Sequence, residues 1–382
     1  MRILLGGVPF GCDNVGDEAI LNCVIRIFRR NFPEAELAVA TGEPEATAAR
    51  YPVRALPLFG FDPAVPLRQF RRAVRHFDWY VWAGATGLSD YPALGAAFLE
   101  AAQAAGAKTV IWQVGMNSEL NPAFFRLGGR RRKLAECLGG ALRWEDWLER
   151  RMRIRLQACV SRCDLVILRD QASLIELHRS GDFPAAFYGA DSAILQESAP
   201  GRLLAPAPDG APSIGICVSA QNALRPSAEL AALLERFHRE LKARIVFIPM
   251  NPRTDRALME EIRQRLSFAD RTVMVEQFEP DEVQNIVGGC DLLISSRLHL
   301  LILGLNKLVP GIGIARGSKI ANYLTPFGLP TVGTTDDCNF AQLFEESRRL
   351  LADGEFAGRA KMARDKLLAR LTASETRLHE IA

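Results

Sequence analysis

The sequence has almost no excess of one charge. Its 382 residues include 47 Lys and Arg against 44 Asp and Glu, which leaves a formal net charge of +3. A balance this even does not favour nucleic acid as a partner, because nucleic-acid-binding domains usually carry a strong basic excess. Hydrophobic residues make up 48% and charged residues 24%, so the composition excludes a disordered or fibrous chain. At about 150 residues per domain, the length predicts two or three globular domains.

The sequence also lacks the signatures of several protein classes. It has no long uninterrupted apolar run and no signal-peptide pattern at its start, and its 8 cysteines are scattered without a C-x-x-C pair. Cys159 and Cys163 have no nearby Cys or His pair to complete a zinc site, so we expect no metal. Walker A, H-E-x-x-H and Ser-His-Asp patterns are missing too. These absences predict a soluble cytoplasmic protein and exclude the P-loop, zincin and serine-hydrolase classes.

Short apolar runs alternate with longer amphipathic stretches throughout the chain, which is the pattern of βαβ units and a parallel sheet. Residues 17–30 and 356–381 have helical patterns. The predicted strands are residues 2–6, 36–40, 79–82, 109–113 and 165–168 in the first half, and residues 213–218, 243–248, 271–275, 291–294 and 311–314 in the second.

A stretch rich in proline and glycine, residues 199–212, separates the two alternating halves. We therefore predict an α/β fold with an N-terminal Rossmann-like αβα domain over residues 1–198. The C-terminal one spans residues 213–382 and ends in helices. Two such domains would face each other across a cleft lined by the carboxyl ends of their strands, where open α/β sheets bind ligands.

The loop after the first predicted strand, residues 10–18, is the first candidate site. Gly16 allows a close backbone approach, and the amides that start the next helix favour an anion or a hydroxyl. Asp17 and Glu18 already neutralise the dipole there, so they suit an acceptor hydroxyl or a base better than a phosphate. The alternative is plain helix capping by Asn14 or Asp17.

The segment 294–299 follows a predicted strand of the second half. Ser295 or Ser296 can cap the next helix, and Arg297 offers a planar fork that matches a carboxylate or phosphate. Arg297 and His299 would diverge on a regular helix, so they converge only if the turn lies between strand and helix. The alternative is a buried histidine with satisfied hydrogen bonds beside an arginine tied to a carboxylate.

A second basic turn, residues 311–319, again joins a predicted strand to a helix. Ser318 is a candidate cap, and Arg316 and Lys319 could surround one dianionic ligand together with Arg297. The alternative is ordinary surface charge beside a glycine turn. Other polar residues follow predicted strands of the first half at the same rim: Asp90, Gln113 and Arg169.

The span 126–155 holds ten Lys and Arg against four Asp and Glu, with Trp144 and Trp147 interleaved. One interpretation is a contact with an anionic membrane surface or a lipid diphosphate, where basic and indole side chains are favoured. The other is a solvated helix face.

Several motifs of the chain, in the same order, resemble those of the polysaccharide pyruvyl transferase family. They are Asn14-Val15-Gly16-Asp17-Glu18, residues 84–90, 113–115 and 169–173, Ser296-Arg297-Leu298-His299, and Lys319. The resemblance runs from residue 14 to 319. It implies a fold similar to the two-domain GT-B glycosyltransferases. It also implies transfer of an enolpyruvyl group from phosphoenolpyruvate to sugar hydroxyls, which closes a ketal and releases phosphate. By the same resemblance Arg297 would bind the donor and His299 would be the acid/base residue.

This resemblance completes a set of expectations for the site. Phosphoenolpyruvate is the co-substrate, and no further cofactor is needed. His299 and Asp17 are the expected catalytic pair, with the donor on the basic rim and the acceptor, free or lipid-linked, across the cleft. The expected donor-binding residues are Arg297, Ser296, Arg316, Ser318 and Lys319, and the expected acceptor-binding residues are Asn14, Gly16, Glu18, Asp90, Gln113 and Arg169.

Two other functions remain open at this point. A GT-B glycosyltransferase that uses a nucleotide sugar would need a carboxylate to grip the ribose, and Glu276 or Glu279 could serve. A non-catalytic relative would bind a saccharide, or assemble a biosynthetic complex, without turnover. The expected location is the cytoplasm, with residues 126–155 as a candidate contact with the inner face of the membrane.

Overall fold

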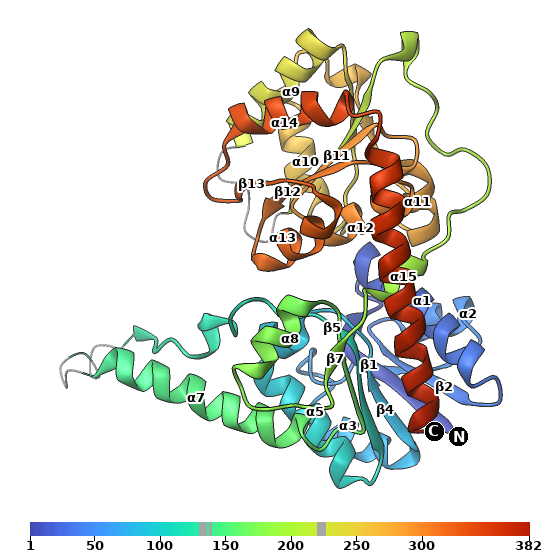
Figure 1. The fold of residues 1–382 in the computed structure, drawn as a ribbon, viewed down its shortest axis with the longest axis vertical. Helices are drawn as coiled ribbons and strands as arrows, with labels where there is room; N and C mark the ends of the chain where they lie inside the picture. Colours follow the sequence, from blue (N-terminus) through green and yellow to red (C-terminus); the bar gives the residue numbers. More distant parts are fainter. Residues whose placement is uncertain (130–135, 137–139, 220–226) are drawn as a thin grey trace. The chain divides into compact units, whose positions relative to one another are not determined.

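The computed structural model describes residues 1–129, 136, 140–219 and 227–382. These residues form two compact units (Figure 1). Unit 1 contains Met1–Cys12, Val24–Asp191 and Arg370–Ala382, and unit 2 contains Asp13–Cys23 and Ser192–Ala369. The predicted domain boundaries at residues 198 and 213 stay a prediction. Two short segments belong to the other unit than the one that these boundaries would give: residues 13–23 belong to unit 2 and residues 370–382 to unit 1.

Unit 1 is built on a seven-stranded sheet in the order β3-β2-β1-β4-β5-β6-β7, and all its strand pairs are parallel. Buried parallel strands read as continuous apolar runs, as β4 does. The strands are β1 (Arg2–Phe10), β2 (Glu36–Thr41), β3 (Arg54–Pro57), β4 (Trp79–Trp82), β5 (Lys108–Val114), β6 (Leu165–Leu168) and β7 (Phe187–Tyr188).

Helices cover this sheet, with α5 packed on β5 and α3 packed on α5. The helices of unit 1 are α2 (Pro44–Arg50), α3 (Leu67–Ala73), α4 (Gly87–Asp90), α5 (Pro92–Ala104), α7 (Ala141–Val160) and α8 (Gln171–His178). Helix α1 (Val15–Asn31) belongs to unit 1 from Val24 onward. Residues 130–135 and 137–139, which belong to the basic span 126–155, lie outside the described residues.

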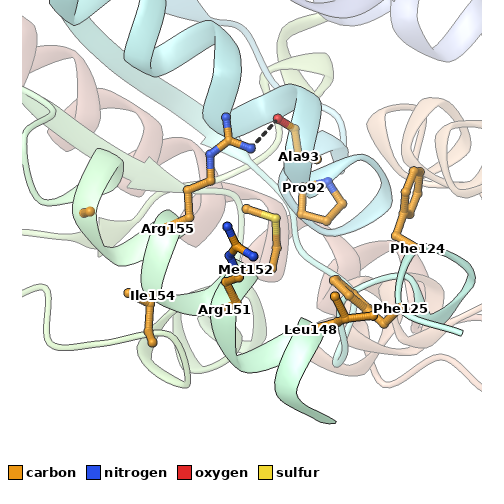
Figure 2. A pocket seen from close by; sticks show the side chains of 10 residues that line it. Pro92, Ala93, Phe124, Phe125, Leu148, Arg151, Met152, Ile154 and Arg155 are labelled. Carbon is orange, nitrogen blue, oxygen red and sulfur yellow. Dashed lines mark hydrogen bonds between the residues drawn. The ribbon is translucent and has the colours of Figure 1, made fainter. Parts of the chain in front are cut away.

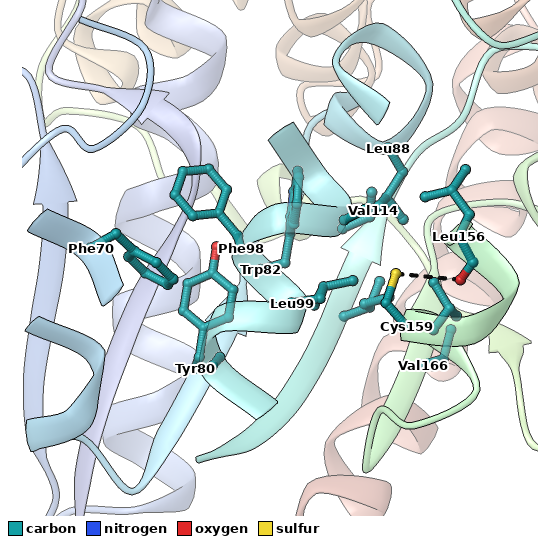
Figure 3. Close-up of a cluster of buried hydrophobic side chains, with 14 of the residues drawn as sticks. Phe70, Tyr80, Trp82, Leu88, Phe98, Leu99, Val114, Leu156, Cys159 and Val166 are labelled. Atoms are coloured by element: carbon teal, nitrogen blue, oxygen red, sulfur yellow. Dashed lines mark hydrogen bonds between the residues drawn. The ribbon is translucent and has the colours of Figure 1, made fainter. Parts of the chain in front are cut away.

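The core of unit 1 is rich in aromatic side chains (Figure 3). Trp82 and Tyr80 of β4 are fully buried, and the ring of Phe98 on α5 lies 4.7 Å from that of Phe70 on α3. Each such ring contributes about 1.5–3 kcal/mol of burial free energy. This core fixes the ends of β4 and β5, where the polar residues of unit 1 begin.

Unit 2 repeats the architecture with a six-stranded parallel sheet in the order β10-β9-β8-β11-β12-β13. The strands are β8 (Ser213–Cys217), β9 (Arg244–Phe247), β10 (Val273–Met274), β11 (Leu292–Ser295), β12 (Gly311–Ala315) and β13 (Thr331–Thr334). The helices are α9 (Ser227–Leu241), α10 (Arg256–Arg263), α11 (Pro280–Val287), α12 (Leu298–Asn306), α13 (Ser318–Leu324) and α14 (Phe340–Leu351). Helix α15 (Phe356–Glu380) belongs to unit 2 as far as Ala369 and to unit 1 from Arg370.

The segment 199–212, predicted as a linker, has no regular element beyond a 3-10 turn at Pro208–Gly210. Asn285 of α11 holds it by donating from Nδ2 to the carbonyls of Ala199 and Gly201, both at 2.8 Å. The prediction of two αβα domains with parallel sheets is confirmed.

Within the described part of the chain, no helix is both long and apolar enough to span a bilayer.

Candidate active site

The turn between β11 and α12 carries Arg297 and His299. Strand β11 ends at Ser295, Arg297 is the extended N-cap residue, and α12 begins at Leu298. The turn therefore lies between strand and helix, as the convergence of the two side chains requires. The expected serine caps are wrong, because Ser295 Oγ bonds the peptide N–H and carbonyl of Arg297 and Ser296 Oγ accepts from the backbone N–H of Ser219.

A buried carboxylate holds the guanidinium of Arg297. Its Nε donates to Asp255 Oδ2 at 3.1 Å, and its Nη2 donates to Asp255 Oδ1 at 2.6 Å and to Thr254 Oγ1 at 3.2 Å. Asp255 is fully buried. The remaining nitrogen, Nη1, makes no hydrogen bond to a described residue. Asp255 thus fixes the plane of the guanidinium and leaves its Nη1 edge for a ligand.

The loop 13–17 joins this site from the beginning of the chain. The N–H of Val15 donates to the carbonyl of Met250 at 2.9 Å, and Arg253 pairs with Asp13. These contacts explain why residues 13–23 belong to unit 2, although the sequence predicted them on the acceptor side of the first domain. Asn14 Oδ1 accepts from Gly16 N at 3.2 Å, so Asn14 does cap α1.

Gly16 lies directly against the imidazole of His299. A Cβ at this position would lie 2.5 Å from Cγ and 2.7 Å from Cβ of His299, and closer still to Nδ1. Carbon atoms do not approach that closely, so only glycine admits the ring there. Position 16 therefore requires glycine for a steric reason, and the backbone of Gly16 packs against the imidazole of His299.

Asp17 is buried beside three cationic side chains. Burial raises its pKa above the usual range, and the nearby charge of His299, the Asn14 hydrogen bond, and the charges of Lys319 and Arg297 lower it in part. Asn14 Nδ2 donates to Asp17 Oδ2 at 2.7 Å. The result is a carboxyl group that keeps its proton to a higher pH than an exposed aspartate, which is a common property of catalytic carboxyls.

The basic turn after β12 supplies Lys319. Strand β12 ends at Ala315 and α13 begins at Ser318, with Gly317 as its N-cap residue and no side-chain cap. The expectation that Ser318 caps this helix is wrong, because the helix already begins at Ser318. Arg316, Ser318 and Lys319 are half-buried.

Unit 1 holds a second polar cluster where β5 and β6 end. Arg169 is almost fully buried, its Nε donates to Asp170 Oδ2 at 2.9 Å, and its Nη1 lies 3.8 Å from Asp191 Oδ2. A Cβ at Gly115 would lie 2.5 Å from the Cζ of Arg169, so this glycine admits the guanidinium. Gln113 is buried here with a positive φ of 53°.

Asp90 lies at the end of α4 in the same unit. Its carboxylate accepts from the Thr86 hydroxyl and, at 2.8 Å, from Asn117 Nδ2. Asp90, Gln113 and Arg169 therefore belong to unit 1. The other predicted site residues, Asn14, Gly16, Asp17, Glu18, Ser296, Arg297, His299, Arg316, Ser318 and Lys319, belong to unit 2.

Sequence reasoning missed the partners of the two arginines. The contact of Asp255 with Arg297 spans 42 residues, so no local sequence pattern shows it. Asp191 ends the segment Val24–Asp191 of unit 1, where the alternating pattern stops. Among the described residues, no three or more His, Cys, Asp or Glu side chains are grouped so that they could hold a metal ion.

Several solved structures share the fold at low sequence identity. S. aureus MnaA, in a co-structure with UDP, is 10% identical with a TM-score of 0.63 over 95% of this chain and 91% of that one. Anabaena HepE, in complex with UDP and glucose, is 12% identical with a TM-score of 0.59 over 100% and 98%. The glycosyltransferase SnogD from Streptomyces nogalater is 17% identical with a TM-score of 0.58 over 100% and 99%. These likenesses show a GT-B-like fold.

The sequence comparison is more specific than the fold. The family described as polysaccharide pyruvyl transferase matches residues 14–318, which covers most of the chain. The matched range begins at Asn14 of the capped loop and ends at Ser318 beside Lys319, so it includes the Asp17, Arg297 and His299 cluster. The chain belongs to the polysaccharide pyruvyl transferase family.

Proposed function

We propose that this chain transfers a pyruvyl group from phosphoenolpyruvate to two hydroxyls of a cell-surface or exopolysaccharide precursor, forming a ketal and releasing phosphate. The observation that carries the proposal is the cluster in unit 2, where one buried carboxyl, Asp17, lies within the electrostatic reach of His299, Lys319 and Arg297. Three cationic side chains around one carboxyl suit a small ligand that brings several negative charges of its own.

The donor fits the basic part of this cluster. Phosphoenolpyruvate carries a carboxylate and a phosphate on three carbons, so it needs cations on two sides. The Nη1 edge of Arg297 and the ammonium of Lys319 supply them, with Arg316, Ser296 and Ser318 as further donors from the same two turns. Asp255 holds the guanidinium in place and so reduces the entropy lost when the donor binds.

The acid and base roles fall to His299 and Asp17. A sugar hydroxyl attacks the central carbon of the donor while His299 gives a proton to the terminal methylene carbon, which becomes a methyl group. Asp17 takes the hydroxyl proton, and its raised pKa makes it a better base than an ordinary carboxylate. The oxygen of the second hydroxyl then attacks the same carbon and closes the ketal, while phosphate leaves with the proton of that hydroxyl. The proton on Asp17 returns to His299, which restores both groups.

The acceptor requires polar groups without a large excess of charge. In unit 1 the Arg169 guanidinium is balanced by Asp170 and Asp191, and Asp90 and Gln113 offer further hydrogen-bonding groups. Asn14, Gly16 and Glu18 of the capped loop would supply further groups of this kind in unit 2. The scheme needs no cofactor other than the co-substrate.

A nucleotide-sugar transferase is the second candidate. HepE and MnaA, which share the fold, were solved with UDP. In this chain the carboxylate of Glu276 pairs with Arg256 at 2.7 Å in an exposed position, so a ribose would have to displace that ion pair. Glu279, the residue before α11, is the other carboxylate that the sequence offers for the role.

Phosphate release from phosphoenolpyruvate, measured with purified protein and a panel of free and lipid-linked saccharides, tests the proposal. We expect release that depends on an acceptor and is lost in His299→Ala and Arg297→Ala, while the exposed Arg349→Ala, which pairs only on its own helix, keeps it.

UDP release from UDP-sugars with no reaction of phosphoenolpyruvate would favour the glycosyltransferase. Binding of saccharide without release of either product would favour the non-catalytic relative. Acceptor-dependent release that survives in His299→Ala would contradict the assigned chemistry.

A further inference from the structure

Helix α7 exposes an unusual amount of apolar surface. Leu142, Trp144, Trp147 and Ile154 are 71%, 52%, 47% and 65% exposed. Among the described residues ten large hydrophobic side chains are exposed, and these four make up nearly half of them. Two more, Phe124 and Tyr91, pack ring to ring at 6.3 Å beside the same helix, since Phe124 lines a groove along α7. An apolar patch of this kind on one helix indicates a contact surface.

Four exposed side chains of α7 share one face, and Leu142 lies outside it. Trp144, Trp147, Arg151 and Ile154 are spaced three or four residues apart, so they form one stripe along the helix. The two indoles pack edge to face at 5.7 Å, and the Arg151 guanidinium lies 5.4 Å from the Trp147 ring. The stripe is therefore preorganised.

A groove of about 680 Å³ continues this stripe toward the end of the helix. In Figure 2 the side chains of Arg151, Met152, Ile154 and Arg155 on α7 line one side. Its other lining residues are almost all apolar: Pro92, Ala93, Phe124, Phe125, Leu148 and Ala158. Among the described residues that line the groove, Arg151 and Arg155 carry charge, and Arg155 is paired with Glu100. Arg151 is thus left to meet the anionic end of an apolar chain.

The opposite face of α7 is firmly anchored in unit 1. Leu156 and Cys159 belong to the hydrophobic core, and α7 packs on α5. Arg153 donates to Glu176 at 2.8 Å and Arg155 forms two hydrogen bonds of 2.7 Å to Glu100. The exposed stripe therefore does not result from a helix that lacks a place in the fold.

Charge on this face selects the partner. Arg143 and Arg150 flank the stripe, and neither makes an ion pair with a described residue, whereas Arg153 and Arg155 are paired inward. A second copy of the chain seated on the stripe by a two-fold axis would bring these arginines against each other. Anionic lipid headgroups would neutralise them instead, and indoles are favoured at the boundary of headgroups and acyl chains.

We propose that the α7 face of unit 1 docks on an anionic phospholipid bilayer. Trp144 and Trp147 insert at the headgroup level, Arg143, Arg150 and Arg151 bind lipid phosphates, and the groove beside Met152 receives part of one acyl chain. This function is separate from the proposed chemistry, since no residue of the unit 2 cluster takes part.

Vesicle flotation and tryptophan fluorescence test this docking without any turnover. The chain has five tryptophans, and Trp79, Trp82 and Trp112 are buried, so a change in emission reports on the α7 pair. With vesicles of phosphatidylcholine and phosphatidylglycerol we expect flotation, a blue shift and quenching by brominated acyl chains. With phosphatidylcholine alone we expect far weaker binding.

The variants separate the indoles from the arginines. Trp144→Ala with Trp147→Ala should weaken vesicle binding on the order of 100-fold, about tenfold per indole. Arg143→Gln with Arg150→Gln should weaken it by about 25-fold, about fivefold per arginine. The matched controls are Met362→Ala, an exposed apolar side chain of α15, and Arg68→Gln with Arg72→Gln on α3.

Three results would overturn the proposal. One is no flotation with anionic vesicles, and another is flotation that the Trp144→Ala and Trp147→Ala pair does not change. The third is self-association in solution that disappears in the same pair, which would make a second copy the occupant. Phosphate release from phosphoenolpyruvate with a soluble acceptor should be unchanged in all these variants, so failure of one proposal is distinguishable from failure of the other.

Discussion

The two units place arginines at the carboxyl ends of their sheets in opposite ways. In unit 1, Arg169 is nearly inaccessible and lies between Asp170 and Asp191. In unit 2, Arg297 pairs with one carboxylate, that of Asp255, and also donates to Thr254; it is more exposed and keeps its Nη1 edge open. Lys319 and His299 add cationic charge around Asp17 in that unit.

The difference shows how one architecture can prepare two kinds of binding site. Balanced charge suits a neutral ligand with many hydroxyls, because those are bound by hydrogen bonds and not by net charge. Excess cationic charge suits a small polyanion. The pairing of each arginine, more than its presence, therefore distinguishes the proposed acceptor side from the proposed donor side.

The largest expected effect breaks the packing of Gly16 against His299. Gly16→Ala should reduce turnover on the order of 10²–10⁴-fold, as much as His299→Ala, because the added methyl group displaces the imidazole. Acceptor-dependent phosphate release measures this loss. Gly354→Ala is the control, since a Cβ there meets no atom within 4 Å. Full activity in Gly16→Ala would show that the imidazole position does not matter.

Removing Arg169, whose charge is balanced by Asp170 and Asp191, should affect the stability of the fold more than donor binding. Arg169→Ala leaves two carboxylates without their cation, and we expect a loss of about 3 kcal/mol in the free energy of unfolding. Denaturant titration measures it, with the exposed Arg162→Ala as a control that changes little. The affinity of the folded protein for phosphoenolpyruvate should not change. A large loss of that affinity would contradict the assignment of the donor to the Arg297 cluster and not to the Arg169 cluster.

Matched substitutions of the two arginine partners sharpen the comparison. Asp255→Asn should raise the KM for phosphoenolpyruvate about tenfold with the acceptor KM unchanged, because Arg297 loses a charged hydrogen-bond partner. Asp170→Asn should raise the KM for the acceptor and leave the KM for phosphoenolpyruvate unchanged, because Arg169 loses a charged hydrogen-bond partner. Initial-rate kinetics with each substrate varied in turn provide the test. Equal effects of both variants on both constants would contradict the assignment of donor and acceptor sides.

The smallest expected effect concerns the stability cost of Asp17. Because burial raises its pKa, the folded state holds the proton more tightly than the unfolded state, and this contribution to stability is lost as pH rises above the ordinary aspartate range. Asp17→Asn should therefore increase the unfolding free energy at pH 7 while it reduces turnover. Melting curves should converge near pH 4. A destabilised variant at pH 7 would mean that the cationic neighbours outweigh burial.

Most of the fold follows from local sequence pattern. The predicted strand at 79–82 and that at 165–168 coincide with β4 and β6, because both are continuous apolar runs. The edge strands β3, β7 and β13 were missed, since they are short and only partly buried and their sequences alternate little. Edge position lowers the apolar content on which the prediction depends.

The site was predicted as a set of residues, and its arrangement was predicted less well. Arg297, His299 and Lys319 follow strands of one sheet, so their grouping in unit 2 follows from topology. The assignment of the Asp17 loop to that unit depends on contacts such as Val15 with Met250, which are 235 residues apart and leave no local signal. The expected serine caps fail for two reasons: Ser296 Oγ accepts from Ser219, which is 77 residues away, and Ser295 Oγ bonds the backbone of Arg297 just before the helix.

Equilibrium binding of phosphoenolpyruvate to the full chain, measured by calorimetry without an acceptor, is the direct test of the donor site in unit 2. We predict binding that weakens at least about tenfold in Lys319→Ala, because the ion loses a charged partner, and stays unchanged in Asp90→Asn. Binding lost in Asp90→Asn but kept in Lys319→Ala would contradict the claim. Tight binding of UDP with none of phosphoenolpyruvate would contradict it as well.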